Sequence, residues 1–206
     1  MSDLKKEQER LNRFFSAGLT DEQLRLLGQI TVIWNKNEFL LKRLIARAAK
    51  WPTDVGELIT IDLPSVTLET LAKNVIQKLT PDGEWKSYAL AAVEFYSEAR
   101  TTRNNIIHSL PKLSFELRAS NKAHKHSAKA GSGKIKITEY DISVPALEEL
   151  VKTLMDVELV LKTAEVRLRD FISPPDDDMP VTLIDIKKIR ATVDRLRSRR
   201  HTQDKR

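Results

Sequence analysis

The chain has 206 residues, of which 41% are hydrophobic and 31% charged, a balance typical of a globular protein built from amphipathic helices. This composition excludes a fibrous chain, and the absence of cysteine excludes disulfides, thiol catalysis and cysteine-based metal centres. Four histidines leave little for other metal sites, so we expect no metal and no cofactor. The formal net charge is +6, but the basic residues gather in segments 117–138 and 186–206, and the remaining chain carries −7.

The N-terminal quarter predicts one short and one long helix. Residues 4–15 predict a short polar helix, within an N-terminal segment 1–20 that precedes the folded domain. A long helix is expected to start after Thr20, whose side chain can cap it, and to run to about Lys50. Glu38 falls inside its apolar stripe and needs a partner there. The stripe has the three- and four-residue spacing of one helix face: Leu27, Ile30, Trp34, Leu41, Ile45 and Ala48.

Two further helices are expected in the middle of the chain. Prolines and a glycine within residues 51–64 predict a connection, with a short extended piece around Ile59–Leu63. Helix is expected from Ser65 to about Leu79, and again from Glu84 to about Leu110, before Pro111. The second of these carries one apolar face: Tyr88, Ala92, Phe95, Ala99, Ile106 and Leu110.

The sequence pattern changes after Pro111 and predicts two strands. Residues 112–118 and 134–140 alternate with the period of two that strands require, so we expect a small two-stranded β-hairpin. The segment between them, 119–133, is small, basic and rich in Gly and Ser, and is expected to be a loop. His124 and His126 lie in it, but no third ligand accompanies them, so a solvated loop is favoured over a metal site.

The last third predicts one more core helix and a basic end. Helix is expected from about Pro145 to Phe171, which closes a helical domain over residues 21–172. Residues 173–181, rich in Pro and Asp, predict a linker, and residues 182–206 a basic helix or tail. No stretch has the ~18 apolar residues that spanning a bilayer needs, and the charged start does not fit a signal peptide. We therefore expect an all-α cytoplasmic protein with no membrane partner.

One motif stands out near the end of the expected helix 84–110, where the chain reads Ala-Arg-Thr-Thr-Arg-Asn-Asn-Ile-Ile-His from residue 99. Arg103, followed by Asn104 and then by His108, resembles the signature of the HEPN superfamily, an arginine followed after four to six residues by a histidine. The resemblance covers roughly residues 20–172. It implies a helical bundle whose catalytic members are homodimers and cleave single-stranded RNA without metal. It also implies a toxin–antitoxin or phage-defence setting, with an antitoxin or another defence-system protein as partner.

The residue types of this motif suit RNA cleavage without a metal. A histidine can transfer a proton near neutral pH, and the planar fork of an arginine can hold two phosphate oxygens and stabilise developing charge. Asn104, four residues before His108, can orient the imidazole, and Glu38 is a candidate partner for Arg103. One helix places Arg103 and His108 about 140° apart, so we expect two motif helices to pair across a symmetric homodimer interface.

Basic residues around the motif are candidate RNA contacts. Arg100 lies one turn before Asn104 and can reach a phosphate, and three lysines of the basic hairpin segment are further candidates: Lys122, Lys125 and Lys129. Together with the C-terminal basic segment they are expected to act as mobile arms that bring RNA to the motif. Such contacts are non-specific and weaken steeply with salt.

Two other interpretations stay open at this point. In the first, the motif is structural, with Arg103 bound to a carboxylate and His108 to a carbonyl at the helix end. The protein would then be a non-catalytic module that dimerises and binds RNA or a protein, and Glu38 would be an ordinary ion-pair partner. In the second, the basic C-terminal helix binds DNA in a regulator, although no helix-turn-helix spacing supports this.

Overall fold

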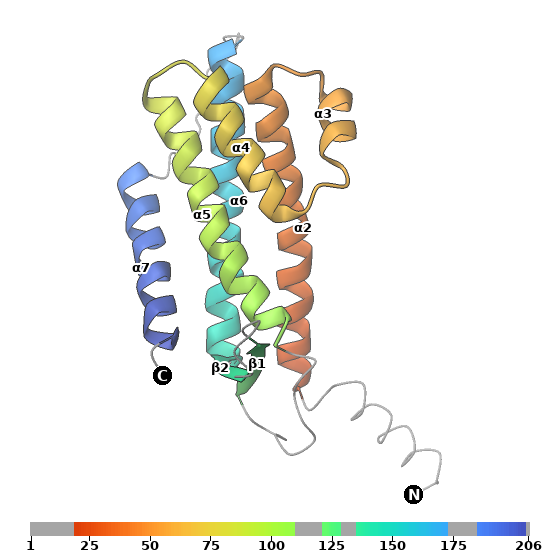
Figure 1. Cartoon of the computed structure of the whole chain (residues 1–206), viewed down its shortest axis with the longest axis vertical. Coiled ribbons are helices and arrows are strands. Elements are labelled where there is room, and N and C mark those ends of the chain that lie inside the picture. Colours follow the sequence, from red (N-terminus) through yellow and green to blue (C-terminus); the bar gives the residue numbers. More distant parts are fainter. Residues whose placement is uncertain (1–18, 110–120, 129–134, 173–184, 205–206) are drawn as a thin grey trace, which may run out of the picture.

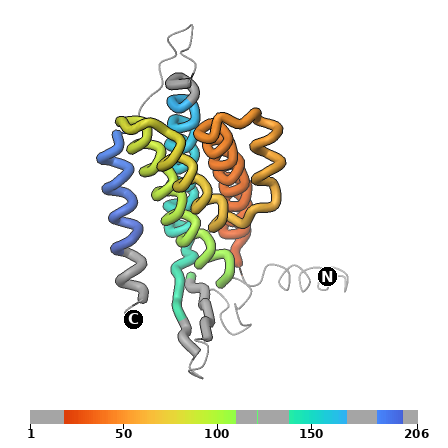
Figure 2. The backbone as a smooth tube through the Cα atoms, turned by 45° about the horizontal axis from the view of Figure 1, so that its top comes forward, coloured from red at the N-terminus to blue at the C-terminus, as the bar shows by residue number. Residues whose placement is uncertain are grey.

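The structure, a computed structural model, describes residues 19–109, 121–128, 135–172 and 185–204. In residues 122–128, 135–137, 169–172 and 199–204 it describes the backbone alone. These parts form a helical bundle with one antiparallel pair of strands at one end (Figures 1 and 2), as the helical patterns predict. Over the same residues, none of the helices has the length and apolar character that crossing a membrane requires.

Helix α2, Asp21–Ala49, is the long helix expected from the first apolar stripe. The Thr20 hydroxyl accepts a hydrogen bond from the Gln23 backbone N–H (3.2 Å), and the Gln23 side chain accepts one from the Thr20 N–H (2.8 Å). This reciprocal capping box satisfies two N–H groups that the first turn leaves unpaired. Gln23 also donates to the carbonyl of Ile142 (2.8 Å), which fixes the start of α2 against the start of α6.

Helix α3, Thr53–Thr60, corrects the sequence prediction, which placed a connection and an extended piece here. Pro52 precedes the first turn, a position where a missing N–H costs nothing, and Gly56 lies inside the helix instead of ending it. A Cβ at Gly56 would lie 2.4 Å from the Cβ of Ala46, so the glycine is required for the close approach of α3 to α2. The prediction failed because this requirement comes from packing between helices.

Helices α4, Ser65–Leu79, and α5, Glu84–Ile107, are confirmed, although α5 ends three residues before the predicted end. His108 is its C-cap residue, and its backbone N–H donates to the carbonyl of Asn104 (3.0 Å). The core face of α5 packs on α2, where the rings of Trp34 and Tyr96 stack with their centroids 4.8 Å apart. The motif helix is therefore anchored in the centre of the bundle.

Strand β1, Lys122–Ala128, pairs antiparallel with β2, Ile135–Asp141, from Lys122 opposite Asp141 to Ala128 opposite Ile135. The second predicted strand is thus found, but the first, at residues 112–118, falls outside the described residues. Its place is taken by a segment that the sequence analysis assigned to a loop. The chain Lys-Ala-His-Lys-His-Ser-Ala lacks the β-branched and aromatic residues that favour strands, so pairing with β2 decides its conformation.

Helix α6, Val144–Ile172, packs on both α2 and α5 and supplies the core residues of the far side of the bundle. Buried Asn37 on α2 donates to the Leu154 carbonyl of α6 (2.9 Å), a polar tie inside the core. Helices α2 and α6 are therefore joined by both apolar packing and buried hydrogen bonds.

Helix α7, Ile186–Asp204, lies along α5 in both views (Figures 1 and 2). Of the two predicted alternatives, a basic helix or a tail, the structure has the helix. The expected mobile arm is wrong, because Ile189 and Val193 are 1% and 2% exposed and belong to the core. The predicted linker 173–181 and the predicted helix 4–15 lie outside the described residues.

We predict that Gly56→Ala lowers the free energy of unfolding by about 1–3 kcal/mol, because the new methyl group forces α3 away from Ala46. Gly28→Ala is the matched control: this glycine is exposed in α2 with nothing within 4 Å of an added Cβ, so the change stabilises by up to about 1 kcal/mol. Urea unfolding followed by circular dichroism measures both. Equal effects of the two variants would contradict the packing role of Gly56.

Candidate functional site

The motif lies at the C-terminal end of α5, the same end of the bundle as the β-hairpin (Figure 1). Arg103 and Asn104 belong to the last turns of the helix, and His108 follows as the C-cap. The Arg103 and Asn104 side chains are half-buried, whereas His108 is exposed. The end of the helix thus presents the imidazole to solvent next to two partly covered polar groups.

Arg103 is half-buried and forms no ion pair with a carboxylate among the described residues. Its Nη1 donates to the Oδ1 of Asn104 (2.9 Å), and its guanidinium carbon lies 5.6 Å from the centre of the Trp34 ring. Its Nε is buried and has no hydrogen-bond partner in the part of the chain that the structure describes. Burial lowers the pKa of Arg103, although the negative charge of Glu38 opposes this shift. The structure therefore brings Arg103 and Asn104 together and leaves part of the hydrogen-bonding capacity of the guanidinium unused.

Glu38 lies near Arg103 but binds another residue directly. It accepts a short hydrogen bond from the hydroxyl of Ser65 at the start of α4. No ion pair joins Glu38 to Arg103, both of which the structure describes, so Glu38 acts on the guanidinium by its field alone. Burial, together with the charge of Glu38, raises the pKa of Tyr96, although Ser65 and the charge of Arg100 oppose this shift.

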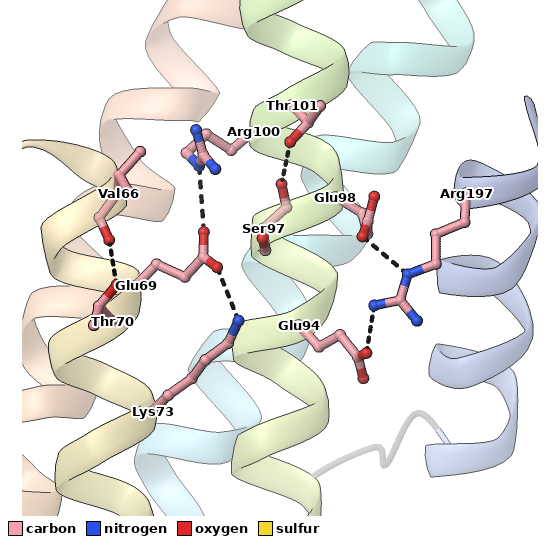
Figure 3. A network of polar contacts seen from close by, with 10 residues as sticks. All are labelled: Val66, Glu69, Thr70, Lys73, Glu94, Ser97, Glu98, Arg100, Thr101 and Arg197. Carbon is pink, nitrogen blue, oxygen red and sulfur yellow. Dashed lines mark hydrogen bonds and ion pairs between the residues drawn. The ribbon is translucent and has the colours of Figure 1, made fainter. Parts of the chain in front are cut away.

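Arg100, the predicted additional phosphate contact, is engaged within the fold. Its Nε donates to Glu69 on α4 (3.3 Å), and the same carboxylate accepts from Lys73 (2.8 Å), as Figure 3 shows. The Arg100 side chain is 17% exposed and that of Glu69 12%. Burial raises the pKa of Glu69, but the hydrogen bond from Lys73 and the charges of Lys73 and Arg100 outweigh it and hold that pKa below its ordinary value.

On the other side of α5 a second arginine is held by carboxylates. Arg197 of α7 donates to Glu94 (2.5 Å) and Glu98 (2.9 Å), again shown in Figure 3. The hydrogen bonds to Glu98 and Glu94 raise the pKa of Arg197. Sequence reasoning missed this contact and that of Glu69. The four-residue spacing of Glu94 and Glu98 on α5 was the available signal, since it aligns two acids toward whatever packs there.

The three predicted lysines have different outcomes. Lys122 and Lys125 lie in β1, whose backbone pairs with β2 near the end of α5, and Lys129 lies outside the described residues. The basic hairpin strand is thus at the same end of the bundle as His108 (Figure 1), which fits the predicted arrangement of a basic element beside the motif.

A pocket of about 290 Å³ opens between α5, β2, α6 and α7, and it does not include Arg103, Asn104 or His108. Its walls contain the carboxylates of Glu98, Asp141 and Glu149, together with threonine hydroxyls and apolar side chains. A phosphate would meet repulsion from three carboxylates there. The pocket is therefore not the phosphate-binding part of the site.

Within the described residues, His, Asp and Glu side chains do not gather in any group of three or more that could hold a metal ion. Comparison of the chain with protein-family models, curated proteins and solved structures finds no match. The functional assignment must therefore come from the side chains themselves.

We predict that Glu69→Gln lowers the free energy of unfolding at neutral pH by about 1–2 kcal/mol, through the lost charge contacts to Lys73 and Arg100. Because the folded state depresses the pKa of Glu69, its ionised form stabilises the fold fully above the ordinary value of 4.5. This stabilisation disappears as the pH falls through the lower folded-state pKa. The difference between wild type and variant should therefore shrink in acid.

Urea unfolding at a series of pH values between about 3 and 7 measures this difference. Glu57→Gln is the control, since Glu57 is exposed on α3 and has no ion pair with a described residue. A pH-independent effect of Glu69→Gln would show that the carboxylate acts through shape and not through charge.

Proposed function

We propose that the protein is a metal-independent endoribonuclease of the HEPN type, which cleaves single-stranded RNA at a composite site in a homodimer. The proposal rests on the Arg103–Asn104–His108 motif and on the way the fold holds Arg103. Arg103 and Asn104 are hydrogen-bonded to each other, and His108 is exposed at the end of the same helix. A toxin or phage-defence role is the setting that the family resemblance suggests.

The observation that carries the proposal is the difference between Arg103 and its neighbours. Arg100 of α5 is bound by Glu69 of α4, and Arg197 of α7 is bound by two carboxylates of α5. Arg103 is half-buried, has a buried Nε without a partner and has no ion pair within the described residues. A charge taken partly out of water without a counter-charge costs free energy. An anion that binds to this guanidinium recovers that cost, which is the property a phosphate site needs.

The reaction would use Arg103 and His108 in different roles. One His108 accepts the proton of the ribose 2′-hydroxyl, and the 2′-oxygen attacks the adjacent phosphorus. Arg103 stabilises the charge on the phosphoryl oxygens. The bond from phosphorus to the 5′-oxygen breaks, and a second imidazole donates the proton that this oxygen takes up. Asn104 orients the guanidinium through the hydrogen bond to its Nη1.

A homodimer supplies what one chain lacks. The acid and the base of this reaction are two imidazoles, but each chain carries a single His108 at the end of α5. Within one chain Arg103 lies against Trp34 of α2, about 140° around the helix from His108. Pairing the exposed ends of two α5 helices about a two-fold axis would bring the partner's His108 to the first copy's motif.

One observation favours a second candidate, the non-catalytic module. The contact of Arg103 with the Trp34 ring is of the kind that stabilises folded proteins by about 0.5–2 kcal/mol, so Arg103 also contributes to packing. In that case the protein would still dimerise and bind RNA or a protein partner through the same end of the bundle, but it would not cut RNA.

We predict that His108→Ala and Arg103→Ala each reduce cleavage of single-stranded RNA in EDTA by a factor of about 10²–10⁴, with the dimer intact. The loss follows from removing proton transfer in the first variant and charge stabilisation in the second. Gel analysis of a labelled RNA measures cleavage, and light scattering measures the dimer. Arg25→Ala, an exposed arginine paired with Glu22 in its own helix, is the control and should cleave normally.

Arg103→Lys separates the two candidate functions further. Lysine keeps the charge but loses the planar fork, so the nuclease should keep RNA binding while cleavage falls. If the wild-type protein binds RNA but cuts none, with or without added metal, the non-catalytic module is correct. If cleavage appears only with added metal, the proposed chemistry is wrong.

Mixing tests the composite site directly. When wild-type chains are exchanged with an excess of His108→Ala chains, most wild-type chains enter heterodimers that hold one imidazole. Activity per wild-type chain should then fall in proportion to the wild-type fraction. An activity per wild-type chain that stays constant would mean that each chain acts alone.

A further inference from the structure

Helix α3 is amphipathic, but its apolar side faces away from the bundle. The residues that it buries against α2 are Gly56 and Thr60, one small and one polar. Its large apolar residues are instead exposed, and two flanking residues continue the same surface: Val55 38%, Leu58 74%, Ile59 45%, Ile61 63% and Val66 55%. We call these five residues the α3 face. An amphipathic helix of a monomeric protein normally turns such residues toward the core.

This orientation is fixed by specific contacts. Gly56 allows the backbone of α3 to approach Ala46, and no larger residue fits there. The Thr60 hydroxyl donates to the Gly56 carbonyl (2.7 Å), so the inward polar group is satisfied. Lys42 of α2 donates to the carbonyl of Ile61 (3.1 Å) just after the last turn. A rotation of α3 that buried its apolar residues would break these contacts and would bring a larger side chain against Ala46.

Three acidic residues alternate in sequence with the apolar residues of the α3 face, and all three are exposed: Asp54, Glu57 and Asp62. The basic group beside the face, Lys42, is bound to the Ile61 carbonyl at its edge. None of the three acidic residues forms an ion pair with another residue in the part of the chain that the structure describes. Contiguous apolar surface with a charged rim marks interaction sites on soluble proteins, and here the rim is acidic.

We propose that the α3 face is the docking site for an amphipathic basic helix of a partner protein, with Leu or Ile on one side and Lys or Arg at the edges. The apolar residues would pack on Leu58 and Ile61, and the basic ones would pair with the three carboxylates. The partner is not a second copy, since a two-fold contact would bring two acidic rims together. An anionic membrane surface would be repelled by the same rim.

Helix α3 lies beside the part of α2 that is away from the β-hairpin, whereas the motif lies at the hairpin end of α5 (Figure 1). Only Val66 of the α3 face comes close to the motif, since the adjacent Ser65 binds Glu38. No residue of the motif belongs to the face, so this inference does not depend on the proposed nuclease. The site therefore suits a protein that recruits or localises this chain rather than one that blocks its RNA cleft.

Two labelled helical model peptides test the proposal with the full-length protein. Both have the same leucine face, and one carries lysine and the other glutamate at the edges. In fluorescence anisotropy we expect the lysine peptide to bind, and to bind about tenfold or more weakly to a Leu58→Asn/Ile61→Asn variant. A variant with Asp54→Asn, Glu57→Gln and Asp62→Asn should bind more weakly and lose the salt dependence.

Val32→Asn is the matched control, because Val32 is 69% exposed on α2, about four turns of that helix away from Ala46. This variant should bind the lysine peptide like wild type, and circular dichroism should show all variants folded. The proposal is overturned if neither peptide binds, if both bind equally, or if Val32→Asn weakens binding as much as the double variant. It is also overturned if the double variant loses binding to anionic vesicles, or if it abolishes a wild-type dimer.

Discussion

The contact between α5 and Trp34 of α2 is the interaction on which the candidate site depends. The Trp34 ring stacks on Tyr96 at 4.8 Å, and it carries the Arg103 guanidinium at 5.6 Å, two turns further along α5. The same aromatic side chain thus joins the core to the motif. A shift of α5 along α2 would separate the rings and release Arg103 into solvent, where its charge would be fully hydrated and an anion would gain little by binding it.

The distribution of ion pairs explains why a chain with a net charge of +6 does not present a uniformly basic surface. Arg197, from the strongly basic C-terminal segment, is bound by two carboxylates of α5, and Arg100 is bound by Glu69. These ion pairs neutralise two arginines close to the motif, and they join α4 and α7 to opposite sides of α5. Within the described residues, two half-buried arginines, Arg103 and Arg167, have a buried Nε without a hydrogen-bond partner, and each lies over a tryptophan ring. Arg103 is the one of the two that belongs to the motif.

The sequence predicts the helices where capping and periodicity agree, and it fails where tertiary packing decides. The capping box at Thr20 and the stripe through Trp34 predict α2 almost to the residue. Gly56 and the prolines around it indicate a break in the helix. In the structure the glycine instead allows α3 to pack closely on Ala46 of α2, and this contact between helices cannot be predicted from the local sequence. In the basic C-terminal segment the charged majority concealed Ile189 and Val193, two buried residues at helical spacing, so a packed helix was taken for a mobile arm.

For the site, the sequence predicts residue types better than partners. Arg103, Asn104 and His108 are recognised from their spacing. Asn104 was expected to orient the imidazole of His108, but its side chain binds the guanidinium of Arg103 instead. Glu38 was expected to pair with Arg103, yet the hydroxyl of Ser65 binds it, because α4 begins directly beside that part of α2. The consequence favours anion binding: a carboxylate already engaged by a hydroxyl neutralises Arg103 less than a direct ion pair would. The negative charge of Glu38 opposes the fall in the pKa of Arg103 that burial causes. The guanidinium keeps a buried Nε without a partner among the described residues, as the proposed phosphate contact requires.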